Sequence, residues 1–148
     1  VENVLATIER FSLSPSNIIM EITESIFIEN YDLVMKNMLA LTQAGVKFYL
    51  DDFGTGYSNL TNVISLPFST IKMDRSLVLA MEEGNKGVSL FFDLVSTFKG
   101  VGFNILVEGV ETNLQNKLVE RAGVDYIQGF LYSRPLPPEE CIELLQRS

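Results

Sequence analysis

Apolar residues along the chain follow two alternating spacings. Short apolar runs recur, and longer segments between them have apolar residues at every third or fourth position. The short runs are typical of buried strands, and the longer spacing is typical of one face of a helix. The pattern predicts strands over residues 17–22, 46–50, 70–73, 104–107 and 125–129. It predicts helices over residues 2–11, 31–44, 58–64, 86–99, 114–122 and 138–146.

This alternation of strands and helices predicts an α/β fold built from parallel strand–helix units. About five units in one compositionally uniform domain fit either a small doubly wound sheet or part of a (β/α)8 barrel. A complete barrel typically needs ~250 residues, whereas this chain has 148. In the barrel alternative, the chain would form the last five of eight units.

The same pattern predicts which residues are buried. Residues 17–22 read as a strand that is buried on both faces. Cys141 lies on an apolar face of the last predicted helix and is expected in the core. Aromatic residues near the last predicted strand are expected to pack rather than to stack on a ligand. These are Tyr126, Phe130 and Tyr132.

Charge and composition exclude several classes of function. The chain has 11 basic and 19 acidic residues and a net charge of −8, and an acidic surface is repelled by nucleic-acid polymers. It has no histidine and one cysteine, which excludes Ser-His-Asp and Cys-His catalysis, imidazole-based zinc sites and an intrachain disulfide framework. No apolar run approaches the ~20 residues of a membrane span, and no signal-like start is present, so we expect a cytoplasmic protein.

Polar groups gather at the carboxyl ends of the predicted strands. In parallel α/β folds this edge carries function, because the loops after the strands converge there. Several carboxylates at one edge repel each other unless a cation compensates, and all-oxygen ligands favour Mg²⁺, Mn²⁺ or Ca²⁺ over zinc. Two such ions ~4 Å apart can clamp a phosphate ester during hydrolysis. The residues are Glu21, Asp51, Asp52 and Glu108, with Lys72 and Gln128 at the same strand ends.

Residues 51–60, DDFGTGYSNL, contain the highest density of residues suited to a functional site. Their glycines permit positive φ angles, and their hydroxyl and N–H groups suit a phosphate or the fixing of the acids. The segment lacks the third glycine of a dinucleotide fingerprint and the Gly-Lys of a P-loop, and a chain without histidine cannot supply the His-Arg-Asp loop of a kinase. Because Asp51 and Asp52 are adjacent, we expect their side chains to diverge, so that one could bridge two metals while the other faces one.

Each polar group taken singly also has a structural explanation. A strand-end aspartate can cap the next helix, and Glu24 and Glu111 can each serve a helix start. Lys72 can form a salt bridge with a neighbouring acid, and Gln128 can satisfy backbone groups. The coincidence that five consecutive strands place a polar group at the same end favours a shared site.

Five segments carry a family resemblance in the same order as in the family. They are EITE at 21–24, DDFGTGYS at 51–58, IKMD at 71–74, VEGVET at 107–112 and QGFLYSRP at 128–135. Together they resemble the EAL domain family, the cyclic di-GMP phosphodiesterases of bacterial signalling. The resemblance covers essentially the whole chain and implies that residues 1–148 are the C-terminal part of one such domain. It therefore implies a partial (β/α)8 TIM-type barrel of about five βα units.

The resemblance also implies an activity, which is hydrolysis of cyclic di-GMP to linear pGpG with Mg²⁺ or Mn²⁺ in a two-metal site. It implies that Lys72 orients or deprotonates the attacking water and that Gln128 helps to position the site. Glu24 would anchor the loop at 51–58, and Glu111 would support the site. The implied metal ligands are Glu21, Asp51, Asp52 and Glu108, of which Glu108 is also counted as catalytic.

One departure from the family pattern concerns its Glu-Ala-Leu strand and the Asn on the following strand, neither of which the chain contains. These residues normally complete the coordination of the first metal, and three barrel strands would precede the matched region. We therefore expect the 148-residue chain to be inactive by itself and to associate with a second copy or with the missing segment through its open sheet edges. Two alternatives stay open. One is a degenerate EAL domain that binds cyclic di-GMP without hydrolysis, and the other is a barrel enzyme that forms a metal-stabilised enolate.

Overall fold

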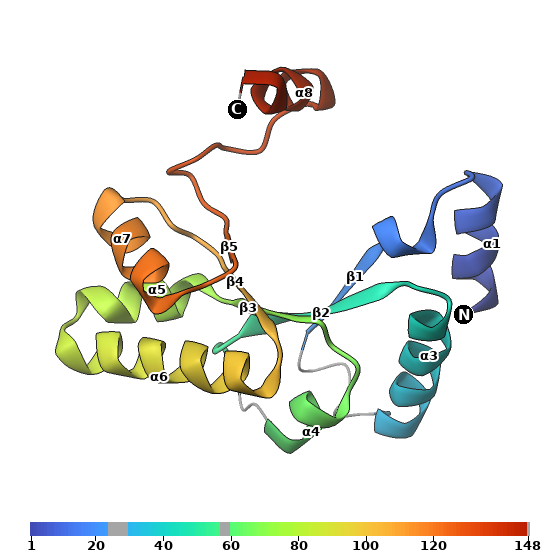
Figure 1. Ribbon diagram of the computed structural model, residues 1–148, viewed down its shortest axis with the longest axis horizontal. Coiled ribbons are helices and arrows are strands. Elements are labelled where there is room, and N and C mark those ends of the chain that lie inside the picture. The colour runs from blue at the N-terminus through green and yellow to red at the C-terminus, as the bar shows by residue number, and fades with distance from the viewer. Residues whose placement is uncertain (24–29, 57–59, 148) are drawn as a thin grey trace.

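The computed structural model describes residues 1–23, 30–56 and 60–147. A single sheet lies at its centre, in which the five strands follow sequence order and all neighbours are parallel (Figure 1). A doubly wound sheet reverses its strand order at a switch point, whereas a barrel winds in one direction. The observed order therefore favours the barrel alternative. The strands are β1 (Ile19–Thr23), β2 (Lys47–Phe53), β3 (Thr70–Met73), β4 (Asn104–Val107) and β5 (Tyr126–Ile127).

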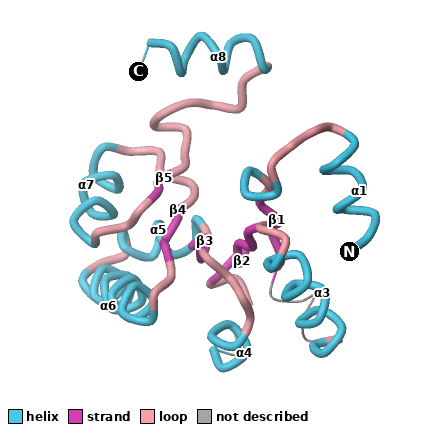
Figure 2. Tube along the Cα trace, turned by 45° about the vertical axis from the view of Figure 1, so that its right-hand side comes forward, coloured by secondary structure: helices cyan, strands magenta, loops and turns pink. Residues whose placement is uncertain are grey.

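Except for α8, the helices lie around the outer, convex side of the curved sheet (Figure 2). Each predicted helix is present, with both ends within two residues of the prediction. In the described part of the chain, no helix is long and apolar enough to cross a membrane. The helices are α1 (Glu2–Arg10), the 3-10 helix η1 (Pro15–Asn17), α3 (Tyr31–Gln43), α4 (Leu60–Ser65), α5 (Arg75–Glu82), α6 (Asn85–Val101), α7 (Asn113–Ala122) and α8 (Pro138–Arg147).

Helix α5, which follows β3 directly, was not predicted. Asp74 caps it by accepting a hydrogen bond from Ser76 N at 2.9 Å, and the helix buries Val78 and Met81. Its eight residues form only about two turns, so the spacing of apolar residues has too few repeats to stand out.

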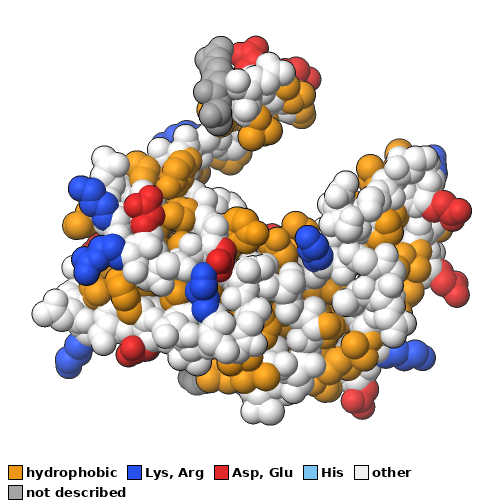
Figure 3. Space-filling model, viewed as in Figure 1, with side chains coloured by type: hydrophobic (Ala, Val, Ile, Leu, Met, Phe, Trp, Pro, Cys, Tyr) orange, Lys and Arg blue, Asp and Glu red, His pale blue; other side chains and the backbone are white. Residues whose placement is uncertain are grey.

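The two faces of the sheet have different environments, because successive side chains of a strand point to opposite sides. One face lies under the helices and forms the core of the molecule. The other face is concave, and the space-filling view shows a hollow over it, between the sides of the molecule that carry α8 and α1 (Figure 3). Side chains on the concave face can therefore reach solvent from strands that are anchored in a packed core. The core side chains include Phe48, Leu50, Ile71, Met73, Ile105 and Val107.

Some predictions of burial and length are wrong. β1 is not buried on both faces, because none of its residues is fully buried and Ile19 is 45% exposed. Cys141 is exposed, since α8 stands apart from the sheet at the end of an extended segment (Figure 1). An amphipathic pattern predicts an apolar face but not the surface that covers it. β5 is also shorter than the predicted 125–129 and contains Tyr126 and Ile127 alone.

Candidate metal centre at the carboxyl ends of the strands

Lys72, Glu108 and Gln128 lie on the concave side of the sheet. Lys72 pairs with Leu106, and Glu108 follows Leu106 by two residues. Tyr126 also pairs with Leu106, and Gln128 follows Tyr126 by two residues. Residues two apart along an extended segment face the same side, so β3, β4 and β5 direct these three polar side chains to one face.

A β-bulge in β2 brings two adjacent acids to this same face. Glu21 of β1 pairs with Tyr49 of β2, and Asp51 follows Tyr49 by two residues, so Glu21 and Asp51 both lie on the concave side. Asp52 would face away from it, but the register of β2 on β3 shifts between Leu50 and Phe53 and gives β2 one extra residue. Asp52 adopts a φ of 56° there, a left-handed conformation that aspartate tolerates better than most residues. Such a bulge re-aims a side chain.

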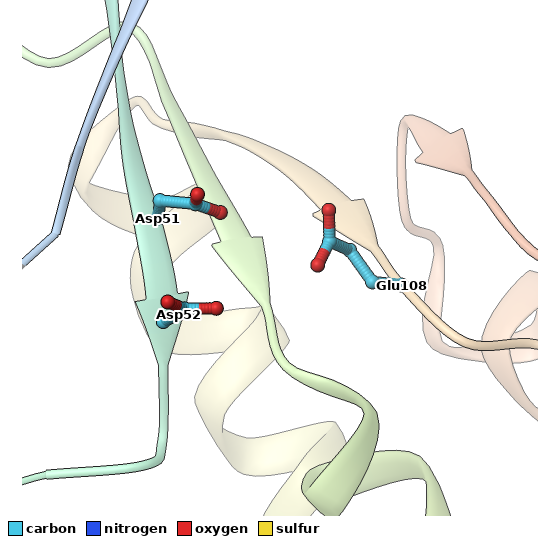
Figure 4. Close-up of side chains that lie close together, drawn as sticks. All are labelled: Asp51, Asp52 and Glu108. Atoms are coloured by element: carbon cyan, nitrogen blue, oxygen red, sulfur yellow. The ribbon is translucent and has the colours of Figure 1, made fainter.

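The carboxylates of Asp51, Asp52 and Glu108 therefore converge. One oxygen from each lies within 4.8 Å of the other two, and Figure 4 shows the two aspartates on β2 and the glutamate after β4 facing the same space. The prediction that Asp51 and Asp52 diverge is wrong, because it assumed a regular strand.

Lys72 occupies the centre of the site. Its Nζ lies 2.9 Å from Glu21 Oε1, 2.8 Å from Asp51 Oδ1 and 2.9 Å from Glu108 Oε1, and its side chain is 7% exposed. Burial by itself lowers the pKa of Lys72, but hydrogen bonds with Asp51, Glu21 and Glu108 outweigh it and hold the pKa above its usual value. The predicted salt bridge of Lys72 is confirmed, and it ties Glu21 to the other acids.

The donor set fits hard divalent cations. Glu21, Asp51, Asp52 and Glu108 carry four negative charges against one positive charge on Lys72, which leaves −4 + 1 = −3. Asp51 Oδ1 is buried and, among the described residues, has no hydrogen-bond partner beyond its ion contact with Lys72. Carboxylate oxygens are the ligands that Mg²⁺, Mn²⁺ and Ca²⁺ prefer, and a divalent charge here would offset the excess.

A cavity of about 560 Å³ adjoins Glu108 beside the ends of β4 and β5. Two arginines line it. Arg75 Nη2 donates to Glu111 Oε2 at 3.0 Å, and the guanidinium carbon of Arg134 lies 4.6 Å from the centre of the Phe130 ring. Guanidinium groups bind phosphates well, and aromatic rings stack on planar groups. The cavity therefore suits an anionic ligand with a planar part.

Gln128 and Glu111 line this cavity and lie outside the three-carboxylate cluster. Glu111 does not cap α7, so the capping alternative is wrong for this residue. The N-cap is Thr112, which forms a reciprocal capping box with Gln115. Glu24, predicted to anchor the loop at 51–58, lies outside the described residues.

Both arginines of the cavity, Arg75 and Arg134, were missed as functional residues at the level of sequence. The nearby aromatic residues were expected to pack, which is wrong, because Tyr126, Phe130 and Tyr132 are 50%, 52% and 56% exposed. Both arginines lie at or next to the quoted motifs. Arg75 directly follows IKMD, and Arg134 is the residue before the final proline of QGFLYSRP. Their position at these motifs was the signal in the sequence that could have identified them.

Comparison with known proteins supplies the family. Residues 1–135 match the family model described as "EAL domain". The chain belongs to the EAL domain family. Its curated relatives include the bifunctional diguanylate cyclase/cyclic di-GMP phosphodiesterase MucR and the cyclic di-GMP phosphodiesterase RocR, both from Pseudomonas aeruginosa. They are 34% and 33% identical over 142 residues, which cover 96% of this chain.

Solved structures with the same fold carry ligands. The PaMucR phosphodiesterase in complex with c-di-GMP superposes with a TM-score of 0.87 at 34% identity, over 95% of this chain and 57% of that one. BlrP1 from Klebsiella pneumoniae, solved with manganese and cyclic di-GMP, superposes with a TM-score of 0.81 at 31% identity, over 89% of this chain and 34% of that one.

These EAL structures are TIM-like barrels, which confirms the predicted α/β class and the partial TIM-type barrel. This EAL chain spans 21% of the length of MucR and 36% of that of RocR.

Proposed function

We propose that residues 1–148 are the C-terminal part of one EAL phosphodiesterase domain, whose parent protein hydrolyses cyclic di-GMP to linear pGpG with Mg²⁺ or Mn²⁺. The observation that carries this proposal is the convergence of Asp51, Asp52 and Glu108 within 4.8 Å, beside the buried ammonium of Lys72. The relatives named as cyclic di-GMP phosphodiesterases support the substrate. The manganese complex of BlrP1 supports a divalent ion.

The cavity beside Glu108 offers the groups that a cyclic dinucleotide needs. The ring of Phe130, with Arg134 against it, offers a flat surface for a guanine base. Arg75 offers positive charge for a phosphate. Gln128 lines the same cavity and supplies an amide that can donate to one oxygen and accept from one N–H group.

The acids and the lysine have different roles in the proposed reaction. Glu21, Asp51, Asp52 and Glu108 would hold the divalent cations, which supply Lewis-acid stabilisation of the phosphate and activation of water. Lys72 Nζ, which contacts three carboxylates, would orient the attacking water. The water oxygen joins phosphorus and the water gives up a proton, one P–O ester bond breaks, and the leaving oxygen takes a proton to become a hydroxyl.

Two further roles follow from the resemblance. Glu111 would support the site by holding Arg75 at the cavity wall, as its 3.0 Å ion pair suggests. Glu24 would anchor the loop at 51–58.

The 148-residue chain contains no Glu-Ala-Leu segment, from which the family pattern supplies a further ligand. We therefore propose that the full-length protein turns over substrate and that this chain alone does not. Binding of cyclic di-GMP without hydrolysis is the second candidate function, and the same observation favours it for the chain alone.

The test is formation of pGpG by the full-length protein with Mg²⁺ or Mn²⁺, followed by chromatography. Turnover is expected to require the metal and to fall more than about 100-fold in Glu108→Gln, beyond the usual effect of losing an outer partner of a ligand. Glu139→Gln makes the same change at an exposed site on α8 and is expected to behave as wild type. Tight nucleotide binding without pGpG would overturn hydrolysis and establish the binding function instead.

A further inference from the structure

Gln115 is one of three buried polar or charged side chains among the described residues, and it is 3% exposed. It lies in the first turn of α7, outside the carboxylate cluster. Its Oε1 accepts hydrogen bonds from Glu111 N at 2.7 Å and Thr112 N at 2.9 Å, and its Nε2 donates to Glu82 Oε1 at 3.0 Å. A buried amide with these partners is costly to disturb, because losing one leaves a buried polar group unpaired.

The two backbone N–H groups that donate to Gln115 Oε1 belong to the loop between β4 and α7, which begins at Glu108. The start of this loop is tied to the sheet. Glu108 N donates to Met73 O at 3.0 Å, and Val110 N donates to Gln128 O at 3.2 Å. The sheet thus holds the first half of the loop, and Gln115 holds the second half.

The loop is closely packed against its neighbours at two points. A Cβ atom on Gly129 would lie 2.0 Å from Val110 O, and one on Gly109 would lie 2.5 Å from Arg75 Cγ. Gly109 also has a φ of 72°, a left-handed turn directly after Glu108. Closely packed groups pass a displacement to their neighbours, so movement of Glu111 is transmitted toward Glu108.

We infer that Gln115 is a positioning residue for the candidate metal centre. Held by Glu82 at the end of α5, it sets the loop after β4 and, through the loop, the Glu108 carboxylate. A capping box alone requires only the contacts with Thr112 and explains neither the bond to Glu111 N nor that to Glu82. The identity of the metal rests on the proposed function, whereas the coupling of Gln115 to Glu108 rests on these contacts.

An exchange of side chains between positions 115 and 82 separates positioning from charge. Gln115→Glu keeps the acceptor for both loop N–H groups but sets a carboxylate against the Glu82 carboxylate. The double variant Gln115→Glu/Glu82→Gln restores the hydrogen bond with donor and acceptor reversed and keeps the net charge of wild type. Glu82→Gln alone keeps an acceptor for Gln115 Nε2 and is the matched control.

The first measurement is the Mn²⁺ affinity of the chain, determined by electron paramagnetic resonance of free Mn²⁺. Gln115→Glu is expected to weaken binding about 10-fold, as for loss of an outer partner of a ligand, although its added negative charge alone would strengthen binding. The double variant is expected to recover wild-type affinity, and Glu82→Gln is expected to match wild type. Val95 is a buried residue of α6, so Val95→Ala creates a cavity in the core of the molecule. This variant is expected to lower the stability of the chain without changing its Mn²⁺ affinity.

The second measurement needs no metal. Amide hydrogen exchange is expected to speed up at Glu108 and Val110 in Gln115→Glu, although neither amide bonds to Gln115. If the wild-type chain does not bind Mn²⁺, formation of pGpG by the full-length protein still decides the proposed function, and amide exchange still decides the positioning role.

Unchanged affinity together with unchanged exchange in Gln115→Glu would overturn the positioning role, as would a folded double variant that does not recover. If Gln115→Glu does not fold, Glu82→Ala at its exposed site serves instead. It is expected to speed exchange at the same two amides, and unchanged exchange there would overturn the inference.

Discussion

Replacing Lys72 by methionine tests whether one buried ammonium holds the acidic cluster together. Methionine keeps most of the apolar stem and removes the charge, so the net charge of the site changes from −3 to −4 when the one positive charge is lost. Asp51 and Glu108, each with a side chain that is 21% exposed, then face each other without a cation. Removing one partner of a buried ion pair is strongly destabilising, because the remaining charge is uncompensated.

The contacts of Lys72 determine how much the free energy of unfolding falls in Lys72→Met. A hydrogen bond to a charged group contributes about 1.5–3 kcal/mol, so the contacts with Asp51 and Glu108 together contribute about 3–6 kcal/mol by the same rule. The contact with Glu21 is discounted, because that side chain is 47% exposed. Breaking a buried pair typically costs about 3–5 kcal/mol. We therefore expect the free energy of unfolding of the metal-free chain to fall by about 3–5 kcal/mol.

The assay is urea unfolding followed by circular dichroism, in a chelator and in excess Mn²⁺. A ligand that binds only the folded state adds about 2.7 kcal/mol at 100 times its Kd. Mn²⁺ is expected to add more to Lys72→Met than to wild type, because the cluster is more negative. Lys99→Met is the matched control. Lys99 lies 2.7 Å from Asp125, but its side chain is 38% exposed, so the loss should stay below about 1 kcal/mol.

A Lys72→Met chain within about 1 kcal/mol of wild type, the value typical of an exposed pair, would refute this reasoning. An equal loss in Lys99→Met would do the same, since burial would then not matter. An equal gain from Mn²⁺ in wild type and variant would show that Lys72 and the metal do not share the same carboxylates.

Three further predictions concern the bulge, an ion pair and the sheet edges. Asp52→Ala is expected to lower the free energy of unfolding by about 1 kcal/mol and Asp52→Gly to preserve it, because glycine adopts the φ of 56° without strain. Denaturant titration compares the two variants, and equal stabilities would show that the backbone at position 52 is not strained. Burial raises the pKa of Asp125, but Lys99 and the Ile105 N–H outweigh it and hold the pKa below its usual 3.8. Asp125→Asn should therefore cost about 0.5–1 kcal/mol at neutral pH and progressively less as the pH falls through the folded-state pKa, in thermal unfolding at several pH values; a constant difference would be contrary to this linkage. The chain is expected to self-associate, as a homodimer in the simplest case, through the open edges β1 and β5, and a monomer at every concentration in sedimentation equilibrium would rule this out.

Local spacing was enough to predict most of the elements. Strands over 70–73 and 104–107 appear in the structure with the same bounds as β3 and β4, and helices over 31–44 and 86–99 appear as α3 and α6 with small shifts at their ends. Helical and extended periodicities depend on near neighbours in the chain, so they can be read without a fold. Helix α5 could not be predicted in this way, because its two turns give too few repeats of the apolar spacing.

Burial depended on long-range arrangement. Cys141 and Phe130 both lie in apolar patterns, yet both are exposed. A pattern shows that a face is apolar, whereas only the arrangement of distant segments shows whether anything covers it.

The sequence by itself determined that this chain forms a parallel α/β sheet and carries acids at one edge, because parallel strands share the direction of their carboxyl ends. Only the tertiary structure decided which of these groups meet. Asp51 and Asp52 face the same space because of a bulge that exists only in the pairing of β2 with β3. Arg75 and Arg134 line one cavity because the start of α5 and the segment after β5, which are distant in sequence, adjoin the same strand ends. Convergence of this kind depends on register and on contacts between distant segments, which local sequence does not encode.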